Sequence, residues 1–441
     1  MLNILKYTLK QLTKITIWRY KPDVIAITGS VGKTSAKEAI YAVLSASGKQ
    51  VRKSGGNLNN ELGVPLTILG NWPEAELKLV SRAQPAGEKK LRKLFFWLKV
   101  VVSAIIRVFN PCPPSLRSGA GRRARKSGYP QVLVLEYGAD RPGDIKKLLE
   151  ICQPKIGIIT AIGEIPVHIE FYSGPEAVVR EKSKLVEQMS VNDFAVLNFD
   201  DKTVMEIKER TRAKLITFGF KEGAEVKITS FENYFEEGLF VGVCFKIEHN
   251  GNIVPVKIQN TIGRSSAYAA GVATCIGLIY ELNLVEICEA LSSNYRPAKH
   301  RMNLISGIKD CWVIDDSYNA SPISMKSALE TIQDLKTNNR KIAILGDMLE
   351  LGEYSSGAHK SIGKLVSGIV DFLITVGPNG KIISESAGLN GLEKDKILSF
   401  DNADEAVKAV RGIINKNDII LVKASRGIGL DKVVEEIKVN S

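Results

Sequence analysis

The sequence has few of the features that identify secreted, membrane-spanning or repeat proteins. Its six cysteines are scattered over 441 residues without a C-x-x-C pair, so neither a disulfide framework nor a cysteine metal cluster is expected. No cleavable signal peptide is evident, and no internal repeat stands out. Apolar residues make up 44% and charged residues 24% of the chain, which is typical of a globular protein with two or three domains. We therefore expect a cytoplasmic protein.

Positive charge is unevenly distributed along the chain. The formal net charge is +12, and residues 81–128 contain twelve basic residues and one acidic residue. The apolar run 94–109 inside this insert is too short and too charged for a membrane span. Residues 1–21 form a similar basic, amphipathic N-terminal arm. Both segments favour peripheral contact with an anionic membrane at its inner face.

Two other interpretations of these basic segments remain. The arm can be a helical extension packed on the main domain, with the insert as a solvated basic loop. Contact with nucleic acid is not expected, because no basic sheet with interleaved aromatic residues and no known nucleic-acid module is present.

Strand-like and helix-like segments alternate after the insert. This order predicts an α/β fold with a mostly parallel sheet covered by helices on both faces. The expected strands are 132–136, 156–160 and 194–198, and the expected helices are 144–151 and 176–189. Residues 225–258 differ, because they predict antiparallel strands joined by a hairpin turn at 249–252. A helix is expected from about 265 to 280.

A second α/β series follows a boundary near residues 295–297. Its expected strands are 312–315, 341–345, 372–376 and 418–422. We therefore expect a P-loop-type central domain with a small antiparallel portion at 22–295, and a C-terminal Rossmann-like α/β domain at 296–441.

A phosphate-binding loop follows the apolar strand 24–28. Its backbone N–H groups and the positive end of the helix at 35–47 would meet phosphates. The common motif G-x-x-x-x-G-K-[ST] would need glycine where Ile27 stands, so this loop is a shorter form. We expect Lys33 to reach the terminal phosphates of ATP and the Thr34 hydroxyl to hold Mg²⁺. The nucleotide-binding residues are expected to be Gly29, Ser30, Val31, Gly32, Lys33, Thr34 and Ser35.

A carboxylate ends the strand 132–136. Glu136 would lie at the carboxyl edge of a parallel sheet, where ligands bind. Since Mg²⁺ prefers carboxylate, phosphate and water oxygens, Glu136 is a candidate metal ligand beside the phosphate loop.

The spacing H-x-E-x-x-x-x-x-E-x-x-x-x-x-K, formed by His168, Glu170, Glu176 and Lys182, resembles the Mur ligase family. These enzymes form amide bonds with ATP in peptidoglycan synthesis, and their phosphate loop has the same short form. The resemblance implies that Lys182 is carbamylated and organises a second Mg²⁺ with His168 and Glu136. It implies catalytic roles for Lys33, His168 and Lys182, and metal-ligand roles for Thr34, Glu136, His168 and Lys182.

The C-terminal half continues this resemblance. The segment 315–325 is similar to the family's D-D-x-Y-N-A-N-P-x-S-M, and Arg301 stands where an interdomain arginine is expected. Together they imply nucleotide contacts by Arg301, Asp316, Tyr318 and Asn319. Segments 57–65, 346–353 and 421–426 match the branch that joins D-alanyl-D-alanine to a muramoyl-tripeptide. This match implies that the substrates contact Asn59, Asn60, Asp347, Leu351, Lys423, Ser425 and Arg426.

Departures from the family pattern leave the identity of the acceptor substrate undecided. Only about twenty residues precede the phosphate-loop strand, where the usual ligase has a domain for the UDP-sugar. Ser265 and Ala269 replace a histidine and an asparagine expected near the base, and Lys184 replaces a common glutamate. The expected protein is a monomeric ATP-dependent ligase that joins a carboxylate and an amine. Alternatives are a ligase for another carboxylate, either folate, cyanophycin-type or lipid-linked, and a nucleotide-binding scaffold without turnover.

Overall fold

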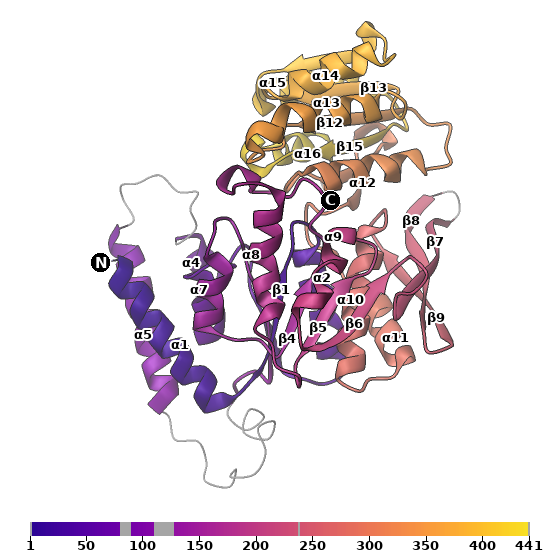
Figure 1. Cartoon of the computed structure of the whole chain (residues 1–441). Coiled ribbons are helices and arrows are strands. Elements are labelled where there is room, and N and C mark those ends of the chain that lie inside the picture. Colours follow the sequence, from indigo (N-terminus) through magenta and orange to yellow (C-terminus); the bar gives the residue numbers. More distant parts are fainter. Residues whose placement is uncertain (1, 80–89, 110–127, 237–238, 440–441) are drawn as a thin grey trace.

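Two β-sheets organise the chain in this computed structural model, which describes residues 2–79, 90–109, 128–236 and 239–439 (Figure 1). The larger sheet has nine strands in the order β2-β3-β1-β4-β5-β6-β7-β8-β9. From β2 to β7 the neighbours are parallel, whereas β7, β8 and β9 are antiparallel. Its strands are β1 (Asp23–Thr28), β2 (Val51–Lys53), β3 (Val132–Glu136), β4 (Ile156–Ile159), β5 (Phe194–Asn198), β6 (Lys214–Gly219), β7 (Val226–Glu236), β8 (Leu239–His249) and β9 (Asn252–Gln259).

Helices cover both faces of this larger sheet. Side chains alternate along β1, so that Ile25 and Ile27 enter one core while Val24 and Ala26 enter the other. The first core includes helices α2 (Lys33–Ala46), α10 (Ser265–Ile279) and α11 (Leu284–Asn294), and the second includes α3 (Gly63–Leu69), α7 (Asp144–Ile151) and α8 (Pro175–Glu187). Two short helices complete this part: α4 (Glu74–Lys78) and α9 (Lys202–Met205).

The second sheet lies above the first in Figure 1. Its order is β10-β11-β15-β12-β13-β14, and its strands are parallel except for the edge strand β10. These strands are β10 (Asn303–Ser306), β11 (Trp312–Asp316), β12 (Lys341–Gly346), β13 (Phe372–Val376), β14 (Ile397–Phe400) and β15 (Ile419–Lys423). Its two cores hold α12 (Pro322–Gln333), α13 (Ser355–Val366) and α14 (Gly380–Leu389) on one face, and α15 (Ala403–Ile413) and α16 (Asp431–Ile437) on the other.

The predicted α/β fold with an antiparallel portion is confirmed. Strands β3, β5 and β13 and helix α7 have the predicted bounds. Strands β2, β6, β10 and β14 were not predicted, and three of them have only three or four residues. Such short strands carry too few side chains to show a periodic pattern.

Two basic helices pack together at one edge of the molecule. Helix α1 (Leu2–Tyr20) and helix α5 (Lys90–Phe109) lie beside α3, and their apolar residues form a separate small core that includes Leu9, Leu66 and Val100. The predicted arm at 1–21 is thus a helix docked on the larger sheet's domain. The ends of the basic insert, at 81–89 and 110–127, fall outside the described residues. Among the described helices, none is long and apolar enough to cross a bilayer.

Candidate active site

The phosphate loop turns between β1 and α2 with two glycines in left-handed backbone. Gly29 has φ 145° and Gly32 has φ 89°. A Cβ atom on Gly29 would lie 2.2 Å from the Thr160 hydroxyl oxygen, because β4 ends directly beside the loop. The Ser30 N–H donates to the Ala161 carbonyl at 2.6 Å. The neighbouring strand thus holds the loop open at the N-terminus of α2, where backbone N–H groups can receive phosphate.

Two lysines converge behind this loop. Lys33 Nζ donates to the Gly29 carbonyl at 2.5 Å, and burial lowers its pKa. Lys182 on α8 is 1% exposed, and burial together with the positive charge of Lys33 lowers its pKa to about 7. A substantial fraction of Lys182 is therefore the neutral, nucleophilic amine near neutral pH.

Glu136 ends β3 beneath the loop as predicted. Its Oε1 lies 2.6 Å from Nζ of Lys37, one helical turn after Lys33, and both side chains are buried. Sequence reasoning missed Lys37, although a lysine four residues after the loop lysine lies on the same side of the helix.

The residues around the loop fit a sparsely held Mg²⁺ ion. The described residues contain no cluster of three or more His, Cys, Asp or Glu side chains that could hold a metal. Mg²⁺ commonly binds through one or two protein oxygens, substrate phosphates and water. The Thr34 hydroxyl and the Glu136 carboxylate provide such oxygens at the phosphate loop, and both residues line the same cleft.

His168 connects the two halves of the molecule. Its backbone is left-handed, with φ 65°, and its Nε2 lies 3.5 Å from Asp140 Oδ1. Its Nδ1 contacts the carboxylate of Glu350, which belongs to the loop after β12. The Glu170 N–H also donates to the Glu350 carbonyl, at 3.4 Å. Asp140 and Glu350 were not among the predicted site residues. Asp140 follows β3 of the same sheet as His168, whereas the approach of Glu350 depends on how the two sheets are placed.

Tyr318 makes a second connection between the halves. Its hydroxyl donates to the Asn57 side-chain carbonyl, and the Arg301 guanidinium lies 4.3 Å from its ring centre. The Arg426 guanidinium lies 5.6 Å from the same ring. The aromatic ring therefore holds two cations at the cleft.

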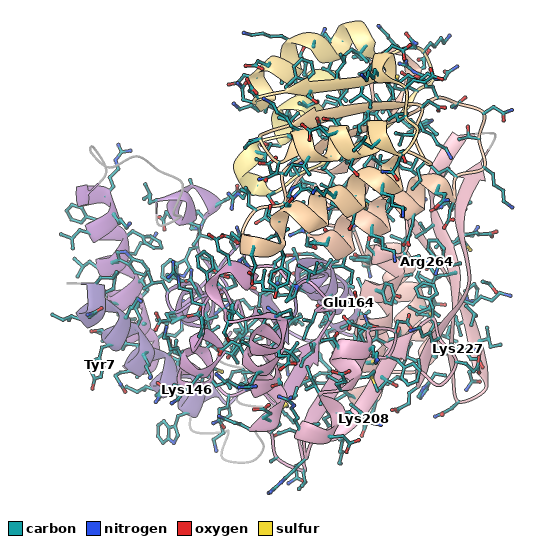
Figure 2. All side chains as sticks on the ribbon, turned by 45° about the horizontal axis from the view of Figure 1, so that its top comes forward. Tyr7, Lys146, Glu164, Lys208, Lys227 and Arg264 are labelled. Carbon is teal, nitrogen blue, oxygen red and sulfur yellow. The ribbon has the colours of Figure 1, made fainter. Side chains whose placement is uncertain are left out.

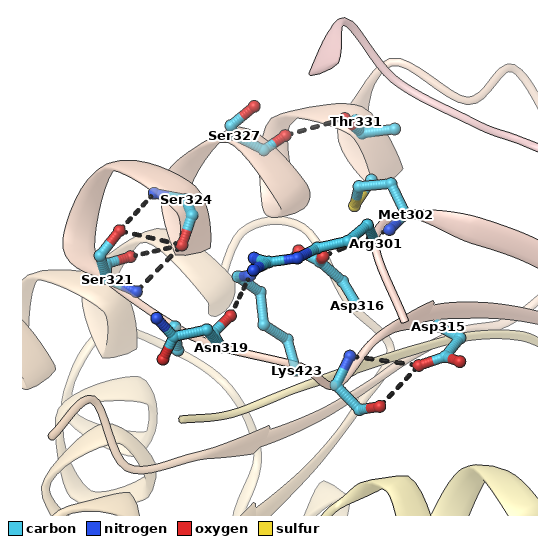
Figure 3. A network of polar contacts seen from close by, with 12 residues as sticks. Arg301, Met302, Asp315, Asp316, Asn319, Ser321, Ser324, Ser327, Thr331 and Lys423 are labelled. Atoms are coloured by element: carbon cyan, nitrogen blue, oxygen red, sulfur yellow. Dashed lines mark hydrogen bonds and ion pairs between the residues drawn. The ribbon is translucent and has the colours of Figure 1, made fainter. Parts of the chain in front are cut away.

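A buried polar network lies beside Arg301 and Asn319 and includes Asp316 and Lys423 (Figure 3). Lys423 Nζ forms an ion pair with Asp316 and donates to the Asn319 carbonyl at 2.9 Å. Asp316 also accepts from the Met302 N–H at 3.2 Å. Burial lowers the pKa of Lys423, while Asp316 opposes this shift. The ion pair joins β11 to β15 and holds the Arg301 and Asn319 segments at the cleft.

The predicted substrate residues fall into two groups. Asn59, Asn60, Lys423, Ser425 and Arg426 line the cleft. Asp347 and Leu351 are not among its lining residues within the described part of the chain, and their contact with substrates stays a prediction. The Asp347 carboxylate accepts the Gly380 N–H at the start of α14 at 2.7 Å, and Leu351 is buried in a core.

Two further residues have local structural partners. The Asn60 side chain accepts the Gly63 N–H at 3.0 Å at the start of α3. Buried His359 accepts the Met348 N–H at 2.9 Å, and burial lowers its pKa. Both shape the loops that border the cleft.

One end of the cleft contains the two positions that depart from the family pattern. Ser265 and Ala269 line it together with Arg264 and Tyr268. The Tyr268 hydroxyl donates to Asp200 at 2.7 Å, and the Arg264 guanidinium lies 5.0 Å from the Phe220 ring. Aromatic and cationic groups therefore dominate this end, without the histidine and asparagine that the family pattern expects.

One cleft of about 2130 Å³ joins these groups. It is lined by the phosphate loop and Glu136 on one side, and by Arg301 and Arg426 on the other. Every predicted catalytic or metal residue except Lys182 lines it, and Lys182 is buried and interacts electrostatically with Lys33.

Known proteins are similar to this chain along most of its length. It is 27% identical to the UDP-N-acetylmuramoyl-tripeptide–D-alanyl-D-alanine ligase of Bacillus subtilis, covering 97% of this chain and 79% of that protein. It is 28% identical to the same-named ligase of Synechocystis, covering 95% and 75%. The fold is similar to that of MurF ligase from Thermotoga maritima in complex with ADP, with a TM-score of 0.74, 23% identity, and coverage of 98% and 83%.

Two family models match the chain. The Mur ligase middle domain matches residues 27–80 and 123–277, which contain the phosphate loop, Glu136, His168 and Lys182. The Mur ligase glutamate ligase domain matches residues 300–426, which contain Arg301, the 315–325 segment and Lys423. Since the two models together match most of the chain and cover both sides of the cleft, the chain belongs to the Mur ligase family.

Proposed function

We propose that this protein is an ATP-dependent ligase that joins D-alanyl-D-alanine to a muramoyl-tripeptide in peptidoglycan precursor synthesis. The observation that carries the proposal is the single cleft shared by the phosphate loop and the C-terminal cations. The names of the Bacillus subtilis and Synechocystis relatives supply the substrates. The two sheets and the two family matches support a division into an arm at 1–21, a central domain at 22–295 and a C-terminal domain at 296–441.

The chain's own residues suit a two-step amide synthesis. The phosphate loop holds ATP so that the acceptor carboxylate attacks the γ-phosphorus and forms an acyl phosphate while ADP leaves. Lys33 and His168 offset the charge that develops on the transferred group. The amine then attacks the acyl carbon and phosphate departs. Arg301 and Arg426 are placed to hold anionic groups opposite the loop, and closure of the two domains excludes water.

Mg²⁺ bound at Thr34 and Glu136 would neutralise phosphate charge and orient the nucleotide. Lys182 would support a second ion through carbamylation. Its neutral amine would add to carbon dioxide and release one proton, which gives an anionic carbamate with oxygen atoms that can bind a metal. The low pKa of Lys182, about 7, favours this reaction.

Phosphate release from ATP tests the proposal. We expect release that requires both muramoyl-tripeptide and D-alanyl-D-alanine, and mass spectrometry should find the joined peptide. Lys33→Ala should abolish release. Lys182→Ala should also abolish it and recover part of the rate when a short carboxylic acid is added. Full activity in either alanine variant would contradict the assignment.

A second candidate is a ligase of the same type that acts on a lipid-linked carboxylate. It is favoured by the lining that α1 contributes to the cleft, where exposed Leu2 lies near Lys6, whose ammonium is paired with Glu61. Parallel assays with UDP-linked and lipid-linked muramoyl-tripeptide distinguish the two. If the acceptor is a folate or a cyanophycin-type carboxylate, neither muramoyl-tripeptide should give phosphate release. A nucleotide-binding scaffold would bind ATP without releasing phosphate.

A further inference from the structure

Helices α1 and α5 present apolar side chains to solvent. On α1 these are Leu2, Ile4, Tyr7, Ile15 and Trp18, and Trp18 is 75% exposed. The spacing of the last four places them on one side of the helix, which Leu2 does not share. On α5 the corresponding stripe is Leu94, Phe95, Leu98, Val102, Ile105 and Ile106. We call the four residues on that side of α1 and the six residues of α5 the outer face. Figure 2 shows Tyr7 at the edge of the molecule, pointing away from the sheets.

The opposite sides of the two helices hold them in place. Leu9, Phe96 and Val100 pack with residues of α3 in a core of their own. The Tyr20 hydroxyl donates to the Arg107 carbonyl at 2.8 Å, which ties the end of α1 to the end of α5. The outer face therefore has no part in this packing, and substitutions there should leave the fold intact.

Helices α1 and α5 themselves carry charge of one sign, although three of their lysines form ion pairs with glutamates of neighbouring segments: Lys6 with Glu61, Lys10 with Glu150 and Lys99 with Glu76. Neither α1 nor α5 contains an acidic residue. Segments 1–21 and 81–128 together carry seventeen basic residues and one acidic residue, whereas the rest of the chain carries 43 basic and 47 acidic residues. The whole positive excess of the protein thus belongs to these segments. On the described helices, Lys14, Arg92 and Lys93 are exposed beside the apolar stripes.

We propose that the outer face docks the protein on an anionic lipid bilayer. Helices lying flat would insert their apolar stripes at the headgroup boundary while the basic residues meet lipid phosphates. Tyr7 and Trp18 are residue types that favour this boundary. A second copy of the chain fits less well, because two surfaces with the same strong positive charge repel each other.

Docking would also place the cleft beside the membrane. Leu2 and Lys6 of α1 line the cleft, so the helix that carries part of the outer face also borders the cleft. The docking proposal itself rests on the helix pair alone and does not depend on the ligase activity.

Co-sedimentation of the full chain with vesicles tests the proposal. We expect binding to phosphatidylcholine vesicles that contain phosphatidylglycerol, weaker binding without it, and loss at high salt. The combined variant Tyr7→Gln, Trp18→Gln, Phe95→Gln and Ile106→Gln should reduce binding by about tenfold or more. The variant Lys14→Gln, Arg92→Gln and Lys93→Gln should reduce only the part that depends on phosphatidylglycerol.

The matched control replaces exposed apolar residues elsewhere: Val191→Gln, Ile253→Gln and Leu389→Gln. This control should bind vesicles as the unchanged protein does. All variants should have the thermal unfolding temperature of the unchanged protein. Absence of binding by the unchanged protein, or undiminished binding by the first variant, would overturn the proposal. Light scattering that shows a dimer, which the first variant converts to a monomer, would assign the outer face to contact between copies instead.

Discussion

Lys37 and Lys182 are both buried lysines near the phosphate loop, yet their surroundings give them different chemistry. Nζ of Lys37 lies 2.6 Å from Oε1 of Glu136, and the two side chains form an ion pair. Lys182 lies near another cation, Lys33, which adds to the effect of burial and favours the neutral amine. One lysine therefore stabilises a candidate metal ligand, while the other is available for carbamylation.

The Lys182 amine should make stability depend on pH. Its pKa is about 7 in the folded protein and 10.5 in its ordinary state. Between these values the unfolded chain binds a proton that the folded chain does not, so the free energy of unfolding rises with pH. In buffer free of carbon dioxide, the free energy of unfolding of the unchanged protein, relative to that of Lys182→Met, should rise by about 1.4 kcal/mol per pH unit between pH 7 and pH 10.5. Below pH 7 this difference should not change with pH. Urea unfolding measures this difference.

The control for this measurement is Lys184→Met. Lys184 is partly exposed and forms an ion pair with Glu181 at 2.6 Å. This variant should retain the pH-dependent gain. Equal pH profiles for the unchanged protein and Lys182→Met would contradict the low pKa.

Lys37→Met should destabilise the protein, because it leaves the Glu136 carboxylate buried without its cation. We expect a loss of about 3–5 kcal/mol in the free energy of unfolding. Lys37→Met combined with Glu136→Gln should restore most of this stability, while phosphate release remains absent. Lys53→Met, which removes a partly exposed ion pair with Glu38, should cost about 1 kcal/mol or less. A similar loss in both single variants would refute the buried-pair argument.

At the scale of elements, the turns after strands build the site. The turn after β1 carries the phosphate loop, and Thr160, the residue after β4, limits the shape of that loop. The loop after β12 brings Glu350 to His168. Each lies at the carboxyl end of a parallel strand, where open α/β sheets bind ligands. The Asp347 carboxylate and buried His359 hold the third turn in position.

Gly29→Ala should impair nucleotide binding while the sheets remain folded. Its Cβ would press on the Thr160 hydroxyl, and φ 145° is unfavourable for alanine. Strain of about 1–3 kcal/mol corresponds to a roughly tenfold to hundredfold loss of ADP affinity if the loop must shift. Calorimetric titration measures this affinity. Gly48→Ala is the control, because Gly48 also has positive φ, 78°, but has open space around it. Unchanged ADP binding by Gly29→Ala would show that the loop tolerates the displacement.

At the scale of the whole molecule, the site requires both sheets in contact. His168 meets Glu350 and Asn57 meets Tyr318 across the boundary between them. The cleft between these contacts brings the phosphate loop to the C-terminal arginines. The two halves are therefore in contact, with the cations of both halves facing one space.

Tyr318→Phe should favour a more open arrangement. It removes the hydroxyl bonded to Asn57 and keeps the ring beneath Arg301 and Arg426. One hydrogen bond contributes about 0.5–1.5 kcal/mol, so we expect a roughly twofold to tenfold lower rate of phosphate release. The radius of gyration from X-ray scattering should increase. Tyr354→Phe serves as a control on the same half of the molecule, and it should change neither quantity. An unaltered rate and radius in Tyr318→Phe would exclude this contact as a closure element.

Local patterns in the sequence determined the fold class, the phosphate loop and most of the cleft residues. The loop and β3 could be predicted because their chemistry depends on neighbours in the chain, and the Mur ligase resemblance added Lys182 and the C-terminal residues. Asp347 and Leu351 were predicted to contact substrates but are not among the residues that line the cleft, since a motif does not reveal whether its side chains point into a cleft or into the fold. The four missed strands were short or lacked a clear pattern.

Only the tertiary structure decided which distant residues share one environment. The ion pair of Lys37 with Glu136, the contact of His168 with Glu350, and the low pKa of Lys182 arise from residues far apart in the chain. Packing also decided that α1 and α5 form one outer face from separate basic segments. Burial and electrostatic interaction depend on distance in space, so sequence spacing alone could not predict them.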